Sequence, residues 1–178
     1  MESQSTPRTE GATVTIYYQD FATPLGTLLL TSNRQALTGC YFLGQKHFPA
    51  SYGKNSQSEW IPVTNDPVLK EAQQIIEDYF RSGVVDCRIT LAPQGTEFQR
   101  QVWSTLLTIP PGQTRSYSQI AAAMGRPTAT RAVAGAIGRN PVSILIPCHR
   151  VVGSNGSLTG YAGGIERKQA LLRLEGAL

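Results

Sequence analysis

The sequence predicts an α/β protein of the α+β kind, in which a small N-terminal antiparallel sheet with one helix precedes a mostly helical C-terminal domain. Apolar residues alternate in short runs before residue 44, whereas after residue 66 they recur every three or four positions. The 178 residues, 40% hydrophobic and 16% charged, suit a folded chain of one large or two small domains. The C-terminal domain is expected to hold a winged-helix-like helix-turn-helix and an active-site strand.

The N-terminal elements follow from local patterns. Residues 13–18, 25–31 and 37–43 alternate as strands do, while the polar stretch 44–65 shows little periodicity. Asp66 and Pro67 supply an N-cap and a first-turn proline for a helix that runs to about Ser82 and stops at Gly83. Residues 1–12 are expected to form a loose tail.

The charge changes sign along the chain. Residues 1–95 carry 7 basic and 9 acidic residues, a net charge of −2, while residues 96–178 carry 9 and 3, a net charge of +6. We therefore place a domain boundary at 91–95, between an α/β domain over 1–92 and a second domain over 96–178. Six arginines lie between Glu97 and Glu166, where no acidic residue occurs. This run favours nucleic acid as a partner, with an ordinary basic surface as the alternative.

The second domain begins with a capping box, Thr96 and Gln99, ahead of an apolar helix face that ends before Pro110. Short helices near 118–124 and 128–138 around a tight turn predict a helix-turn-helix, and a last helix covers 165–174. The residues around Arg131 are almost all small, so this helix either approaches a surface closely or packs as a buried small-residue helix.

Cys148 follows the apolar run 144–146, which is predicted to be a strand, and precedes His149 and Arg150. A free thiol needs a base or positive neighbours to become a nucleophile, and these two residues are the candidates. Contact between Cys148 and His149 requires a turn or a bridging water, because adjacent residues of a strand point to opposite faces. A buried structural cysteine is the alternative, and Cys40 and Cys87 are expected in the core.

The sequence lacks the features typical of disulfide-rich, zinc-binding, secreted and membrane-spanning proteins. Three cysteines, spaced by 47 and 61 residues, favour reduced thiols, and no paired ligand set of a zinc site occurs, so no metal or cofactor is expected. A secretory signal and a membrane-spanning run are also missing, which indicates a cytoplasmic protein.

The motifs PCHRVVG (147–153), RAV (131–133), NP (140–141) and GYAGG (160–164) closely resemble those of the O6-alkylguanine-DNA alkyltransferases. The resemblance covers residues 96–178 with specific motifs and the N-terminal half more loosely. It implies direct-reversal repair, in which an alkyl group moves from O6-alkylguanine in double-stranded DNA, and in some cases from O4-alkylthymine, to a protein cysteine. The nucleotide is flipped out first, and the protein reacts once.

Roles for individual residues follow from the same resemblance. Cys148 is the acceptor, His149 the base acting through a water, Glu175 the residue that orients the imidazole, and Asn140 the brace of the preceding turn. Tyr117 stabilises the guanine leaving group and crowds the phosphate of the flipped nucleotide.

The resemblance also implies which residues hold the DNA. Arg131 is the finger that replaces the flipped base, flanked by the small Ala129 and Ala132. Phosphate contacts are expected from Arg126 and from Arg139, which stands where the family often has a small residue. Another departure is Ala134, where glycine is common. The base pocket is expected to be lined by Tyr161, Ala162, Val151 and Ile137.

The expected partner is therefore duplex DNA containing alkylated guanine, bound by a monomer without an obligate protein partner; cooperative binding on DNA is left open. A non-catalytic lesion-binding protein of the alkyltransferase-like type is the main alternative, although such proteins lack the acceptor cysteine that Cys148 supplies. A helix-turn-helix regulator that senses alkylation and a thiol hydrolase are further alternatives.

Overall fold

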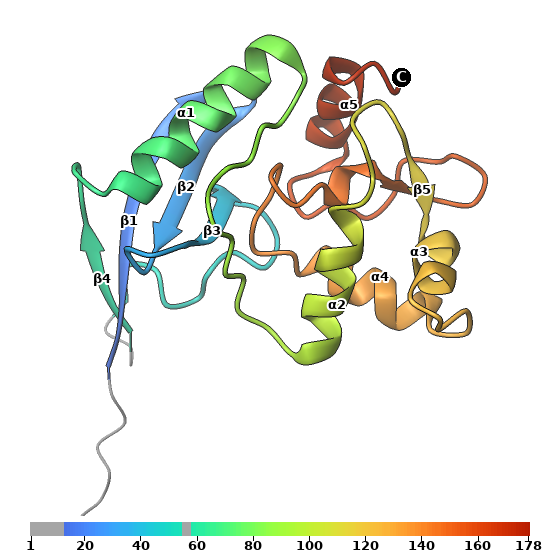
Figure 1. The fold of residues 1–178 in the computed structure, drawn as a ribbon, viewed down its shortest axis with the longest axis horizontal. Helices are drawn as coiled ribbons and strands as arrows, with labels where there is room; N and C mark the ends of the chain where they lie inside the picture. The colour runs from blue at the N-terminus through green and yellow to red at the C-terminus, as the bar shows by residue number, and fades with distance from the viewer. Residues whose placement is uncertain (1–12, 55–57) are drawn as a thin grey trace, which may run out of the picture.

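A computed structural model describes residues 13–54 and 58–178, and the N-terminal half is a four-stranded sheet with one helix on one face (Figure 1). The strands are β1 (Val14–Thr23), β2 (Gly26–Ser32), β3 (Leu37–Phe42) and β4 (Ser58–Pro62), in the order β3-β2-β1-β4. The pairs β1–β2 and β2–β3 are antiparallel, which confirms the predicted sheet. The predicted tail, 1–12, lies outside the described residues.

Strand β4 was not predicted. It pairs with β1 in parallel, with Ile16 opposite Trp60. Its five residues sit at the end of a polar stretch and close on Pro62, so the local pattern is too short to indicate a strand. Pairing with β1 therefore determines this conformation, as is common for short edge strands.

Helix α1 (Pro67–Ser82) has the predicted ends. The Asp66 carboxylate accepts hydrogen bonds from the backbone N–H groups of Val68 and Leu69, and Gly83 closes the helix in the left-handed conformation (φ 72°). One face of the helix is buried against the sheet, through Leu69, Ala72, Ile75, Ile76 and Tyr79.

The C-terminal half consists of helices around a two-stranded sheet (Figure 1). Its elements are α2 (Glu97–Leu106), β5 (Arg115–Ser116), α3 (Tyr117–Ala123), α4 (Thr130–Gly138), the 3-10 helix η1 (Cys148–Arg150), β6 (Val151–Val152) and α5 (Ile165–Leu174). The predicted capping box of Thr96 and Gln99 is present, and Trp103 of α2 donates a hydrogen bond to the Ala136 carbonyl of α4 (2.8 Å). None of the helices in 13–54 and 58–178 is long and apolar enough to cross a membrane.

The predicted strand before Cys148 is wrong. The edge of β3 holds this segment by a single bridge, in which Cys40 N–H donates to Pro141 O (2.8 Å) and Ser143 N–H donates to Cys40 O (2.9 Å). The chain then turns back, with Ile144 at φ 71° and Ile146 N–H bonded to Val142 O (3.0 Å). The run 144–146 is apolar because this turn is buried in the core.

The buried side chains of both halves form one continuous core, so the boundary at 91–95 stays a prediction. Cys40 is buried in β3, as expected. The expectation for Cys87 is wrong: it is exposed, because it lies in the irregular segment after α1, where its thiol donates a hydrogen bond to the Ile89 carbonyl (3.7 Å).

Substitution Asp66→Ala tests the start of α1. Asp66 is fully buried, and its second oxygen accepts the Ser32 hydroxyl at 2.6 Å. Loss of the cap and of Ser32's partner should lower the free energy of unfolding by about 2–4 kcal/mol. Urea denaturation measures this, with the exposed neighbour Asn65→Ala as control; equal stability of the two variants would contradict the analysis.

Candidate active site

The turn before Cys148 is held by Asn140. The Asn140 amide donates to the carbonyls of Ile146 (2.9 Å) and Val142 (3.3 Å), and its oxygen accepts Val142 N–H (3.0 Å). These bonds satisfy a buried amide and hold Ile144 in a conformation that a β-branched residue seldom adopts. The next residues enter the 3-10 helix η1, which places Cys148 and His149 on one tight turn rather than on opposite faces of a strand.

The Cys148 thiol lies in the core with 5% of its surface exposed. Burial raises the pKa of this thiol, while the Asn140 side chain, the charge of Lys168 and the backbone N–H groups of Cys148 and His149 act to lower it. The net direction is upward, so the resting thiol is protonated and needs a base before it can attack.

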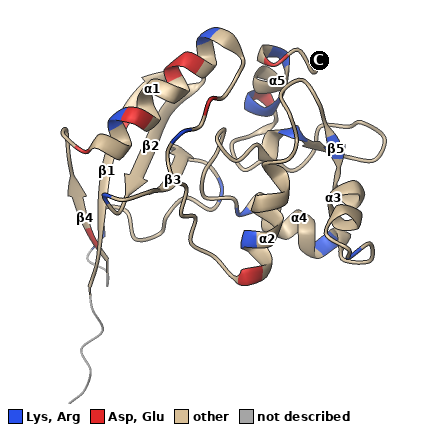
Figure 2. Cartoon of the chain, viewed as in Figure 1, with Lys and Arg blue, Asp and Glu red and all other residues tan. Residues whose placement is uncertain are grey.

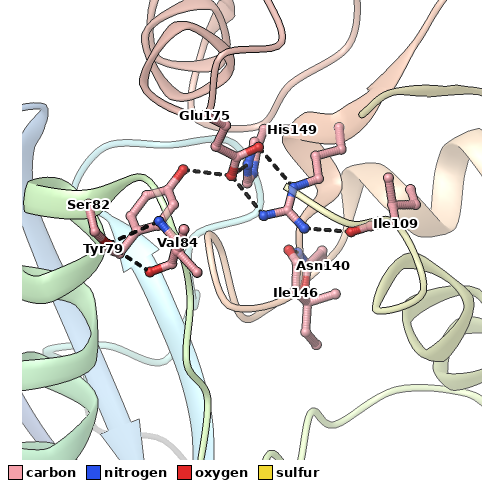
Figure 3. Close-up of polar contacts among 9 residues, drawn as sticks. Tyr79, Ser82, Val84, Ile109, Asn140, Ile146, His149 and Glu175 are labelled. Atoms are coloured by element: carbon pink, nitrogen blue, oxygen red, sulfur yellow. Dashed lines mark hydrogen bonds and ion pairs between the residues drawn. The ribbon is translucent and has the colours of Figure 1, made fainter. Parts of the chain in front are cut away.

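His149 is fully buried and its Nε2 lies 2.7 Å from Glu175 Oε1 (Figure 3). A carboxylate only accepts, so Nε2 carries the proton and Nδ1 of the neutral ring has a free lone pair. Among the described residues Nδ1 has no hydrogen-bond partner. Burial lowers the pKa of His149 more than Glu175 raises it, which keeps the ring neutral and able to accept a proton.

Arg150 faces Glu175 and not the thiol. Its Nε and Nη2 donate to the two carboxylate oxygens (2.9 and 2.8 Å), and Nη1 donates to Ile109 O (2.6 Å) (Figure 3). Burial would raise the pKa of Glu175, but His149 and Arg150 outweigh it and lower the pKa to about 2. Arg150 therefore compensates the carboxylate, and the positive charge that stabilises a thiolate comes from elsewhere.

That charge is Lys168 of α5, which the sequence analysis missed. Its side chain is buried and its ammonium donates to the Thr159 carbonyl (2.7 Å). Burial lowers the pKa of Lys168 to about 8, while Cys148 opposes this shift. One signal was available: Lys168 falls on the same helix face as Leu171, Leu172 and Glu175, where a lysine is unusual.

Tyr117 contacts the same carbonyl oxygen, that of Thr159, as Lys168 does. Its hydroxyl donates to Thr159 O (2.8 Å), and the Lys168 ammonium lies 5.9 Å from the centre of its ring. Gly160 leaves room for this hydroxyl, because a Cβ built there would lie 3.1 Å from it on a backbone at φ 62°. The arrangement places a hydroxyl and an ammonium beside the loop 159–164.

The residues expected in the base pocket come from three places in the fold: α4, strand β6 and the loop before α5. Tyr161 and Val151 are buried, and the Ala162 carbonyl accepts Lys46 N–H (3.1 Å) from the N-terminal half. Ile137 of α4 is also buried in the core, with 3% of its surface exposed. Contact of Ile137 with a base would require the pocket to open, so its role stays a prediction.

The residues expected to contact DNA lie around α3 and α4. Arg131 and Ala132 are exposed at the start of α4, and Ala129 is partly exposed before it. Arg126 and Arg139 are also exposed, with Arg126 lying 5.4 Å from the Phe98 ring and Arg139 bonded to Gly135 O (3.2 Å). In Figure 2 the ribbon is coloured as basic at positions around α3 and α4, whereas α1 carries both acidic and basic positions. Val133 and Ala136 of α4 lie in the core, as the buried-helix alternative expects, and the close approach of the exposed side of α4 to a surface stays a prediction.

No set of three or more His, Cys, Asp and Glu side chains is placed to hold a metal ion within 13–54 and 58–178.

Comparison with known proteins supports a family. A family model described as the 6-O-methylguanine DNA methyltransferase DNA-binding domain matches residues 97–177. The methylated-DNA–protein-cysteine methyltransferases of Methanosarcina acetivorans and Mycobacterium tuberculosis are 42% and 44% identical to the chain, over 91% and 90% of it and 99% and 92% of their own lengths.

Solved structures agree. A crystal structure of M. tuberculosis OGT in complex with DNA has a TM-score of 0.78 at 41% identity, covering 90% of this chain and 93% of that one. An O6-methylguanine DNA methyltransferase from Methanococcus jannaschii has a TM-score of 0.62 at 27% identity, covering 90% and 94%. These matches confirm the resemblance found in the sequence motifs and the predicted fold class. The chain belongs to the methylated-DNA–protein-cysteine methyltransferase family.

Proposed function

We propose that this protein repairs DNA by direct reversal, as a cytoplasmic monomer that moves one alkyl group from guanine O6 in duplex DNA to Cys148 and is then spent. The observation that carries the proposal is a buried thiol on the same tight turn as a neutral imidazole. The Nε2 atom of this ring is fixed by the Glu175 carboxylate, and its Nδ1 atom has no hydrogen-bond partner among the described residues. The names of the relatives and the DNA in the M. tuberculosis structure point to the same substrate class.

In the proposed step the Cys148 proton passes through a water to Nδ1 of His149, and the imidazolium is stabilised by Glu175. The thiolate sulfur attacks the alkyl carbon in line, a sulfur–carbon bond forms, and the carbon–O6 bond breaks. The bonding electron pair stays on guanine, which leaves as an anion until it gains a proton. The thioether has no route to hydrolysis, so the protein reacts once.

The departing guanine gains negative charge near Tyr117 and Lys168, both of which are bonded to the Thr159 carbonyl. The Lys168 ammonium has two further N–H donors and stabilises such charge with little reorganisation, while the Tyr117 hydroxyl exchanges the Thr159 carbonyl for the guanine. Tyr117 is the proton donor in this proposal, and Lys168 stabilises both the thiolate and the anion.

Guanine O6 is hidden inside a duplex, so the nucleotide must leave the stack at a cost of a few kcal/mol. In the proposal α4 lies against the minor groove, where its small residues permit a close approach and Arg131 fills the vacated position. Surrounding arginines contact phosphates, which makes binding largely independent of sequence. Acceptance of O4-alkylthymine is a secondary part of the proposal.

The acceptor is tested by intact and peptide mass after exposure to a duplex containing O6-methylguanine. The Cys148 peptide should gain one methyl group, about 14 Da, because only this thiol has a base and a cation beside it. Cys87→Ser should react as the unmodified protein does, and Cys148→Ala should gain nothing. Methyl on Cys40 or Cys87, or methanol released over repeated turnovers, would contradict the mechanism, while a non-catalytic lesion binder would bind the duplex without any gain in mass.

The role of Arg131 is tested by Arg131→Ala with two substrates. At saturating protein, transfer from duplex DNA should slow about 10- to 100-fold, because the unstacked state loses its stabilisation. Transfer from free O6-benzylguanine, if the pocket admits it, should keep most of its rate. Arg81→Ala, which removes an exposed arginine of α1, is the matched control. Equal slowing on both substrates would place Arg131 in the pocket or the core.

Electrostatic binding is tested by the salt dependence of affinity for undamaged duplex. Affinity should fall steeply between about 50 and 200 mM NaCl, because each neutralised phosphate releases counterions. Arg126→Gln and Arg139→Gln should each reduce the slope of log affinity against log salt by about one, with little change in sequence preference. The Arg81→Ala slope should match that of the unmodified protein. A flat salt dependence would contradict the proposed face.

A further inference from the structure

The last turn of α1, in the N-terminal half, meets the end of α5 at the active-site carboxylate. Tyr79 of α1 is fully buried, and its hydroxyl lies 2.8 Å from Glu175 Oε1 across 96 residues of sequence (Figure 3). Burial and the neighbouring Glu175 raise the pKa of Tyr79, so the hydroxyl stays protonated and donates throughout the working pH range.

The backbones of α1 and α5 also approach each other closely at this junction. A Cβ built on Gly83, the residue that closes α1, would lie 2.5 Å from the carbonyl oxygen of Leu174. Only glycine fits this position, both for that approach and for its φ of 72°. The end of α1 is therefore packed directly on the residue before Glu175.

One oxygen of Glu175 receives three donors: Tyr79 Oη, His149 Nε2 at 2.7 Å and Arg150 Nη2 at 2.8 Å. A carboxylate oxygen has about two in-plane lone pairs, so these donors share limited acceptor capacity. The strength of the His149 hydrogen bond therefore depends on whether the Tyr79 hydroxyl is present.

We propose that Tyr79 is a positioning residue for alkyl transfer, by which the N-terminal half sets the orientation and basicity of His149 through Glu175. The inference rests on the proposed function of Cys148 and goes beyond it, because Tyr79 lies outside the motifs that carry the family resemblance. It assigns to the N-terminal half a part in the chemistry.

The sign of the effect follows from the charged groups that act on His149, which are Glu175, Arg150 and Lys168. The Cys148 thiol and the Tyr161 hydroxyl near it are neutral, because burial raises the pKa of both. Without the Tyr79 hydroxyl, Glu175 is a stronger acceptor for His149 and favours the imidazolium. The pKa of His149 should rise, so the base is already protonated at pH values where it is free in the unmodified protein. The ascending limb of the transfer rate should move to higher pH.

The test compares Tyr79→Phe with the unmodified full-length protein in single-turnover transfer from an O6-methylguanine duplex, over pH 5 to 9. The limb should move to higher pH, with unchanged duplex affinity. On the limb, at about pH 5.5, the rate should fall about 3- to 10-fold, as expected for one lost hydrogen bond, while the plateau above it changes little. Ile76→Val, at a fully buried position one turn earlier, is the control for lost stability. It should lower Tm without moving the limb.

Proton NMR gives a second readout that does not depend on activity. The chain has two histidines, and the exposed His47 is an internal reference; Tyr79→Phe should raise the titration midpoint of His149 alone. An unmoved His149 titration with an unmoved rate profile, or equal uniform slowing in both variants, would overturn the proposal. If the unmodified protein adds no methyl to Cys148, the proposed function fails, and the NMR titration still decides whether Tyr79 sets His149.

Discussion

The buried carboxylate of Glu175 is the constraint on which the rest of the site depends. Its side chain has no exposed surface, and an isolated charge there would be very unfavourable. Four hydrogen bonds, two from Arg150 and one each from His149 and Tyr79, make the ionised form stable and hold its pKa at about 2. Since the pKa is lowered on folding, this stabilisation is present above the unfolded pKa and is lost as pH falls toward 2.

Because one carboxylate joins η1, α1 and α5, the two halves of the chain meet at the site. The edge of β3 also holds the turn before Cys148 through the backbone of Cys40, and Lys46 contacts the carbonyl of Ala162. The N-terminal sheet and helix therefore supply a support against which the turn before Cys148 is fixed, while the region of α3 and α4 presents the exposed arginines that are proposed to contact DNA. In the proposed reaction the N-terminal half supports the reactive turn, and the exposed basic face of the C-terminal half contacts DNA.

Local chemistry explains what the sequence could predict. Asp66, Gly83, Thr96 and Gln99 signal helix ends because caps depend on residues a few positions apart. Strand β4 and the turn at 143–146 depend on pairing with β1 and β3, which no local window contains. An apolar run such as 144–146 fits a strand or a buried turn equally well, so its prediction as a strand failed.

The residues of the site differ in the same way in how far the sequence could predict them. Cys148 and His149 stand out because they are adjacent, and Glu175 and Asn140 follow only from the family resemblance. Lys168 and Tyr79 reach the site from helices whose apolar faces look structural. A lysine on such a face was the one local signal, and the packing of α1 and α5 brings both residues to the site. The central claim is that the charge of Glu175 makes His149 a base. The most direct measurement is the single-turnover transfer rate of Glu175→Gln with duplex O6-methylguanine, on protein whose folding is verified by circular dichroism. Transfer should slow by about 100-fold or more with duplex affinity retained, because His149 loses the carboxylate that stabilises its protonated form; transfer at the unmodified rate would show that the charge of Glu175 is not needed.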